Sequence, residues 1–126
     1  MTLYAMLLYY PADNYWTTPE ERVFTPRYAD FGKAAEAAGV MRGGHALHPG
    51  ESATTITVAD GEGGDVTVTD GPYAEAKEIL GGFYLIEAAD LDEAIKWGAR
   101  IPAAWRGKVE IRPVYPRSQA PGSAPA

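Results

Sequence analysis

The chain has 126 residues, of which 46% are hydrophobic and 22% charged, and its formal net charge at pH 7 is −6. This length and balance are typical of one globular domain and exclude a chain that is disordered throughout. The negative net charge argues against a nucleic-acid-binding or membrane-binding protein, since nucleic acids and anionic membranes bind to basic protein surfaces. No apolar run reaches the 18 residues of a transmembrane helix.

The chain contains no cysteine, which excludes a disulfide and a thiolate nucleophile. Residues 1–10 carry neither Lys nor Arg, so we expect no signal peptide there, and we expect a cytoplasmic protein. Residues 116–126 are rich in Pro, Gly, Ser and Ala and contain no larger aliphatic residue. We therefore predict a folded domain over residues 1–115 and a disordered tail over 116–126.

The first predicted element is a strand over residues 3–10, which is apolar nearly throughout and is expected to be buried on both faces. A helix is expected next, with Thr18 as its N-cap and Pro19 at its first position. Pro26 should break or kink this helix near Phe24 or Thr25, and Gly39 should end it.

Strands and turns dominate the middle of the chain. Residues 60–65 combine Asp and Gly and predict a hairpin loop between two alternating strands. Residues 74–80 are long enough for two helical turns before Gly81. The strands predicted after the first are 40–47, 54–59, 66–69, 83–88 and 108–114.

A second long helix is predicted after residue 90. Asp90 caps it, Glu93 occupies the capping-box position, and Pro102 ends it. Its inner face is expected to consist of Leu91, Ala94, Ile95 and Ile101.

This order of elements predicts an α+β fold that resembles the ferredoxin-like split βαβ arrangement, with both helices on one face of the sheet. The other face would expose apolar side chains in a domain of this size. We therefore expect a second copy to cover it, which makes the protein a homodimer.

Residues 70–78 read DGPYAEAKE, and Gly81-Gly82-Phe83-Tyr84 follow. This motif resembles the DGPF subgroup of the YCII-related domain family. The resemblance extends over almost all of residues 1–115 and is carried further by residues 90–94, Trp97, 101–102 and 109–114, and more loosely by 43–44 and 47–49.

The resemblance implies a dimeric α+β barrel in which two ferredoxin-like sheets pack face to face. It implies little about activity, because most members of the subgroup have no established function and many are known through association with extracytoplasmic-function sigma factors. More distant relatives include small isomerases, lyases and monooxygenases.

Four residues are candidates for acid–base catalysis. Asp70 would be the general base at the mouth of a pocket, or only part of a rigid corner. His45 would exchange protons with Asp70, or be a satisfied core histidine sharing a strand face with Met41. Glu75 and Glu78 share one side of the predicted short helix, where they would act as acid and base or form a solvated face.

Three further residues are candidates for substrate binding. Arg112 would anchor an anionic group, or form an ion pair at a subunit interface. Lys77 belongs to the charged motif, and Tyr84 would line a pocket for an aromatic ligand together with Tyr4.

No metal site or cofactor is expected: His45 and His48 should fall on opposite strand faces, and residues 61–64 lack the Lys and the helix of a phosphate loop. Two functions remain open. One is a cofactor-free acid–base isomerase or lyase acting on an unknown small molecule. The other is a non-catalytic ligand- or partner-binding module, linked through the family association to a sigma-factor system.

Overall fold

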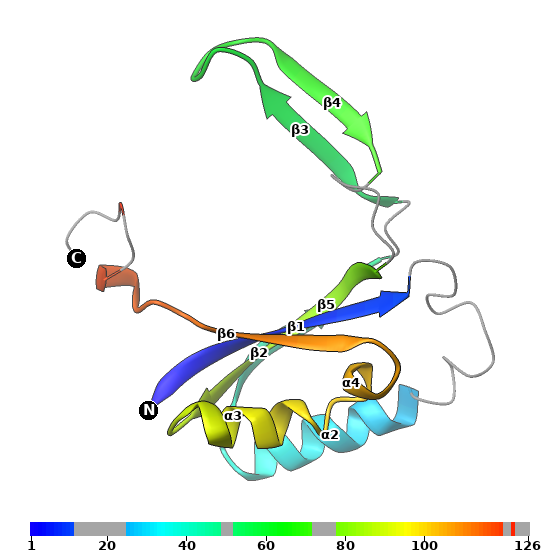
Figure 1. The fold of residues 1–126 in the computed structure, drawn as a ribbon, viewed down its shortest axis with the longest axis vertical. Helices are drawn as coiled ribbons and strands as arrows, with labels where there is room; N and C mark the ends of the chain where they lie inside the picture. Colours follow the sequence, from blue (N-terminus) through cyan, green and yellow to red (C-terminus); the bar gives the residue numbers. More distant parts are fainter. Residues whose placement is uncertain (12–24, 49–51, 72–77, 120–121, 123–126) are drawn as a thin grey trace.

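The computed structural model describes residues 1–11, 25–48, 52–71, 78–119 and 122. A four-stranded antiparallel sheet in the order β2-β5-β1-β6 carries the helices of this described part on one face (Figure 1). None of the described helices is both long and apolar enough to cross a bilayer. The elements are β1 (Thr2–Pro11), α2 (Thr25–Ala37), β2 (Met41–Ala46), β3 (Thr54–Val58), β4 (Val66–Asp70), β5 (Glu78–Ala88), α3 (Leu91–Gly98), α4 (Ala103–Arg106), β6 (Lys108–Pro113) and the 3-10 turn η2 (Arg117–Gln119).

Strands β3 and β4 form a separate two-stranded sheet, which we call the arm and define as residues 52–71. When the arm and the four-residue helix α4 are set aside, the order β1-α2-β2-β5-α3-β6 and the antiparallel sheet are compatible with a ferredoxin-like fold. The mixed α+β class predicted from the sequence is confirmed.

The core lies between the sheet and the helices. Strand β1 alternates strictly, and its buried side chains are Tyr4, Met6, Leu8 and Tyr10. They pack with Phe31 and Ala35 of α2 and with Ile86 of β5. Burial of this one face is the main stabilising contribution to the domain.

The opposite face of the sheet, which we call the open face, is only partly covered. The strand register defines this face. Its apolar side chains are Leu3, Ala5, Leu7 and Tyr9 from β1 with Leu80, Phe83 and Leu85 from β5, and its charged side chains are Glu87 from β5 with Lys108, Glu110 and Arg112 from β6. The expectation that β1 is buried on both faces is therefore wrong for a single chain. The side chains of Leu3, Ala5, Leu7 and Tyr9 on the second face are only partly buried.

Helix α2 begins at Thr25, so Pro26 lies in its first turn, where its missing N–H costs nothing. The predicted N-cap at Thr18 lies outside the described residues. Gly39 has a φ of +73° and follows the helix end, as expected for a C-terminal stop.

Helix α3 is capped as predicted: the Glu93 amide donates to Oδ1 of Asp90 at 2.9 Å. Its predicted inner face is partly wrong, because Leu91 and Ile95 are 51% and 49% exposed. The helix instead docks through Ala94 and through Gly98, where a Cβ would lie 3.1 Å from Cδ1 of Ile111.

The predicted end of that helix at Pro102 is also wrong. Helix α3 stops at Gly98, and Pro102 becomes the N-cap of the four-residue helix α4. A proline suits the start of a helix as well as the residue after one, and here the first role applies.

The prediction of a short helix over residues 74–80 is wrong at its C-terminal end. Residues 78–80 already belong to β5, with Ile79 opposite Tyr10 and Leu80 opposite Tyr9. Cross-strand pairing with β1 outweighs the weak local helical preference. Residues 72–77 lie outside the described part of the chain.

Candidate small-molecule site

Strand β2 changes register at Arg42, and this bulge decides where His45 lies. Met41 is opposite Ile86 while Gly43 is opposite Leu85, so Arg42 is an extra residue. Met41 therefore faces the helices, whereas His45 pairs with Phe83 on the open face. The expectation that Met41 and His45 share a strand face is wrong for this reason.

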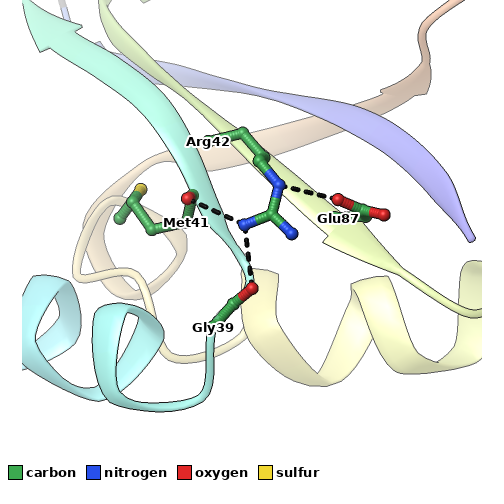
Figure 2. Close-up of polar contacts among 4 residues, drawn as sticks. All are labelled: Gly39, Met41, Arg42 and Glu87. Carbon is green, nitrogen blue, oxygen red and sulfur yellow. Dashed lines mark hydrogen bonds and ion pairs between the residues drawn. The ribbon is translucent and has the colours of Figure 1, made fainter.

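The Arg42 side chain bridges the bulge (Figure 2). Its Nε donates to Oε2 of Glu87 at 2.7 Å, and its NH1 group donates to the carbonyls of Gly39 and Met41 at 2.8 and 3.1 Å. One guanidinium thus ties the turn after α2 to β5, and so holds the register that places His45.

A cavity of about 280 Å³ opens where β1, β2 and β5 meet α2. Most of its lining is apolar or aromatic, with hydroxyl groups and one imidazole as the polar exceptions. The lining residues are Leu8, Tyr10, Tyr28, Gly44, His45, Ala46, Gly81, Gly82, Phe83 and Tyr84.

Close approach of β2 to β5 shapes this cavity and requires glycine at position 44. A Cβ on Gly44 would lie 2.6 Å from the carbonyl oxygen of Phe83 and 2.7 Å from Cδ1 of Tyr84, and its φ of +154° also favours glycine. The absence of side chains at Gly44 and its neighbours in β5 leaves room beside the tyrosine rings.

Three tyrosines surround this space. The hydroxyls of Tyr10 and Tyr28 are hydrogen-bonded to each other. Burial raises the pKa of Tyr28 above its usual range, with a smaller contribution from the nearby Tyr84. Burial also raises the pKa of Tyr84. Both phenols therefore remain neutral at physiological pH and can act as hydrogen-bond donors.

Aromatic contacts fix two of the lining rings. The Tyr84 ring centroid lies 4.9 Å from that of Phe31 in a tilted arrangement. The His45 ring lies 6.0 Å from Phe83 in an edge-to-face geometry. Tyr84 is thus anchored on the helix side of the sheet and His45 on the open face, and the cavity spans the sheet edge between them.

The structure brings two of the predicted site residues, His45 and Tyr84, to this cavity. Asp70 is exposed at the end of β4, opposite Thr54. Glu78 forms an ion pair with Lys108. Neither carboxylate is among the lining residues.

Arg112 is also outside the lining. Its side chain is 71% exposed, and its Nε lies 4.0 Å from Oε2 of Glu110 on the same strand. Glu75 and Lys77 fall outside the described residues. Tyr4 is a core residue that does not line the cavity.

Sequence reasoning did not single out Tyr10 and Tyr28 as site residues. A usable signal was present in two Gly-Gly pairs, 43–44 and 81–82, on strands that pair with each other. Paired glycines beside large rings indicate space for a ligand. Within the described ranges, no three His, Asp or Glu side chains converge as metal ligands would.

These observations define a mixed α+β protein with a pocket at the edge of an antiparallel sheet, in an arrangement compatible with a ferredoxin-like fold. The family model of the YCII-related domain matches residues 2–118, and the chain belongs to this family. It is 37% identical over 123 residues to an uncharacterised protein of Rhizobium meliloti (strain 1021), in an alignment that covers 89% of this chain and 91% of that protein.

Proposed function

We propose that this protein binds a small planar molecule, largely apolar and carrying an oxygen acceptor, in the cavity between α2 and the sheet. The observation that carries the proposal is the grouping of Tyr10, Tyr28 and Tyr84 around a glycine-lined space. Largely apolar pockets with a few placed polar groups are typical of small-molecule sites.

The chemistry of the lining defines the ligand class. Neutral phenol hydroxyls donate hydrogen bonds to carbonyl, carboxylate or phenolate oxygens. Aromatic rings favour a flat partner. A volume of about 280 Å³ lies at the small end of ligand pockets, so the ligand is a metabolite and not a cofactor of nucleotide size.

Binding is tested by calorimetry with phenols, aryl ketones and aryl carboxylates as probes. Tyr84→Phe should weaken the binding of a probe that carries an oxygen acceptor by about three- to tenfold, which corresponds to one lost hydrogen bond. Tyr115→Phe is the matched control, because Tyr115 is 62% exposed and does not line the cavity. Equal losses in both variants, or no binding by any probe, would contradict the proposal.

A catalytic form of the proposal adds one step. An imidazole can take a proton from a carbon next to a carbonyl, and a phenol hydroxyl can stabilise the oxyanion that forms. His45 and Tyr84 are the residues for these roles, and the reaction is that of an acid–base isomerase or lyase. Asp70 and Glu75 remain candidates for a second proton-transfer group.

Catalysis and plain binding differ in one readout, the exchange of ligand C–H protons in D₂O followed by NMR. The catalytic form expects exchange that His45→Gln lowers by about a hundredfold or more. His48→Gln is the control, since His48 is exposed and lies beyond the end of β2. Binding without exchange would leave a ligand-binding module as the function.

We further infer a homodimer whose two sheets pack through their open faces, as in a dimeric α+β barrel. The half-exposed apolar side chains of that face support it. His45 and Phe83 lie on this face, so a second copy would also border the cavity. Light scattering that finds only a 13.5 kDa species at micromolar concentration would overturn this dimer.

Two finer assignments belong with this proposal. The DGPYAEAKE motif supports membership of the DGPF subgroup. A partner-binding role in a sigma-factor system rests on the family association alone, and the cytoplasmic location remains an expectation from the sequence.

A further inference from the structure

The arm has two chemically different faces. Ile56 lies opposite Val68, and Val58 lies opposite Val66, so these four side chains share one face, which we call the aliphatic face. The alternate positions form the threonine face, which consists of Thr55, Thr57, Thr67 and Thr69. A two-faced hairpin of this kind is the pattern of a sheet that is covered on one side.

In the single chain, the aliphatic face is uncovered. Ile56 is 62% exposed, Val66 and Val68 are each 61% exposed, and Val58 is 43% exposed. An isolated two-stranded hairpin is marginally stable in water. Four adjacent, exposed β-branched side chains on such a hairpin therefore indicate that another surface packs against them.

The position of the arm favours a second copy of this chain as that partner. The arm rises on the side of the sheet opposite the helices, which is the side of the open face (Figure 1). One molecule thus presents two unpartnered apolar surfaces on the same side. A two-fold axis lets one identical copy cover both.

Charge complementarity points to the same partner. The arm contains four carboxylates, Asp60, Glu62, Asp65 and Asp70, and no Lys or Arg. Strand β6 is an edge of the main sheet, and with η2 it carries three cations, Lys108, Arg112 and Arg117, against one carboxylate, Glu110. Lys108 is ion-paired with Glu78, so Arg112 and Arg117 are the cations that would face the arm of a second copy. An acidic arm and a basic sheet edge on the same chain can meet only between copies or by refolding of the arm onto its own sheet.

We propose that the aliphatic face of the β3–β4 arm packs against a second copy of this chain, so that the arm of each protomer contacts the other protomer. We call this contact the clasp. This contact goes beyond the sheet-to-sheet dimer proposed above, and the two can fail separately. Threonines and the carboxylates of the arm would then form the polar rim around an apolar centre, as in other protein interfaces.

The chain has no cysteine, so a single introduced thiol reports directly on the arm. Val68→Cys places the thiol on the aliphatic face, and Thr67→Cys places it one residue away on the threonine face. The rates of maleimide labelling are measured for both variants at protein concentrations above and below the dissociation constant of the homodimer, which light scattering provides. Circular dichroism confirms that both variants are folded.

The proposal expects the thiol of Val68→Cys to react about tenfold more slowly than that of Thr67→Cys in the dimer, and equally fast after dilution. Equal rates in a persisting dimer would overturn the clasp and leave the sheet dimer intact. Protection that survives dilution to the monomer would also overturn it, because the arm would then be covered by its own chain. A protein that is monomeric at every concentration overturns both.

A charge on the aliphatic face provides a second, independent test. Val68→Asp should raise the dissociation constant of the homodimer about tenfold or more, since an unpaired carboxylate would be buried. Thr67→Asp is the matched control and should change it by less than about threefold. Equal effects of the two substitutions would contradict the proposal.

Discussion

Arg42 and Glu87 are joined across the β2–β5 strand pair at the residue where the register of β2 slips. The guanidinium Nε lies 2.7 Å from Oε2 of Glu87, and the side chains are 43% and 29% exposed. The NH1 group of Arg42 donates to the carbonyls of Gly39 and Met41. A long-range ion pair therefore holds the local irregularity on which the placement of His45 depends.

Removing this side chain should have a measurable cost. Arg42→Ala is expected to lower the free energy of unfolding by about 1 kcal/mol, since a partly exposed ion pair and two hydrogen bonds are lost together. Urea denaturation measures the change. Arg112→Ala is the control, because Arg112 lies 4.0 Å from its nearest carboxylate and is 71% exposed. Its expected effect is within about 0.5 kcal/mol of zero.

Two glycines should respond to alanine in opposite directions. Gly44→Ala is expected to destabilise the protein by about 3 kcal/mol, because its Cβ would overlap the Phe83 carbonyl at 2.6 Å. Gly32 lies inside α2, and apart from its chain neighbours and the backbone of its own helix no atom lies within 4 Å of the position of an added Cβ. Gly32→Ala should therefore stabilise by about 0.5–1 kcal/mol. Thermal unfolding of the two variants tests both signs, and a stabilising Gly44→Ala would mean that β2 and β5 do not approach this closely.

Alkaline pH should weaken the fold through the buried phenols. Burial raises the pKa of Tyr28 and of Tyr84 above the value near 10 that they have in the unfolded chain. The folded state therefore retains protons that the unfolded state loses, so stability is complete below about pH 10 and falls as the pH rises through the folded pKa values.

Chemical denaturation between about pH 8 and pH 11 follows this loss. Tyr28→Phe should make the decline shallower, because one of the two retained protons is gone. Tyr115→Phe should leave it as in the parent protein, since Tyr115 lies exposed near the C-terminus. A decline that is the same in all three proteins would show that these phenols are not buried.

The cap of α3 offers a local test. Asp90 accepts the Glu93 amide at 2.9 Å, and Asp90→Ala should lower the free energy of unfolding by about 1 kcal/mol. Asp90→Asn keeps a side-chain acceptor and should retain most of that stability. If Asn and Ala cost the same in urea denaturation, then the negative charge near the helix end, and not the hydrogen bond, stabilises the helix.

Local patterns predicted most of the elements, and the elements that failed needed information from distant residues. The alternation of residues 54–58 and the Asp-Gly loop that follows are enough to predict the arm hairpin. The cap of Asp90 is equally local. By contrast, the strand over residues 78–80 exists because β1 is available for pairing, and no nearby residue indicates this.

The candidate site was harder to predict for the same physical reason. His45 was placed on the wrong face because strict alternation was assumed through Arg42, and the bulge depends on Glu87, 45 residues away. Tyr10 and Tyr28 come together only when α2 docks on β1. The family motif drew attention to Asp70 and its neighbours, whereas the cavity is lined by β1, α2, β2 and β5, and of the two strands that flank the motif only β5 contributes to it.

Strands β2 and β5, which precede and follow the arm in the chain, pair with each other directly in the main sheet. Ala46 is opposite Gly82, and the Leu47 amide donates to the Gly81 carbonyl at 2.9 Å, so β2 ends opposite the residues at which β5 begins to pair with it. Segments inserted between adjacent points can change length without disturbing the fold that holds them. The arm can therefore diverge among relatives independently of the pocket, and a short turn in its place would still leave β2 and β5 as an ordinary hairpin.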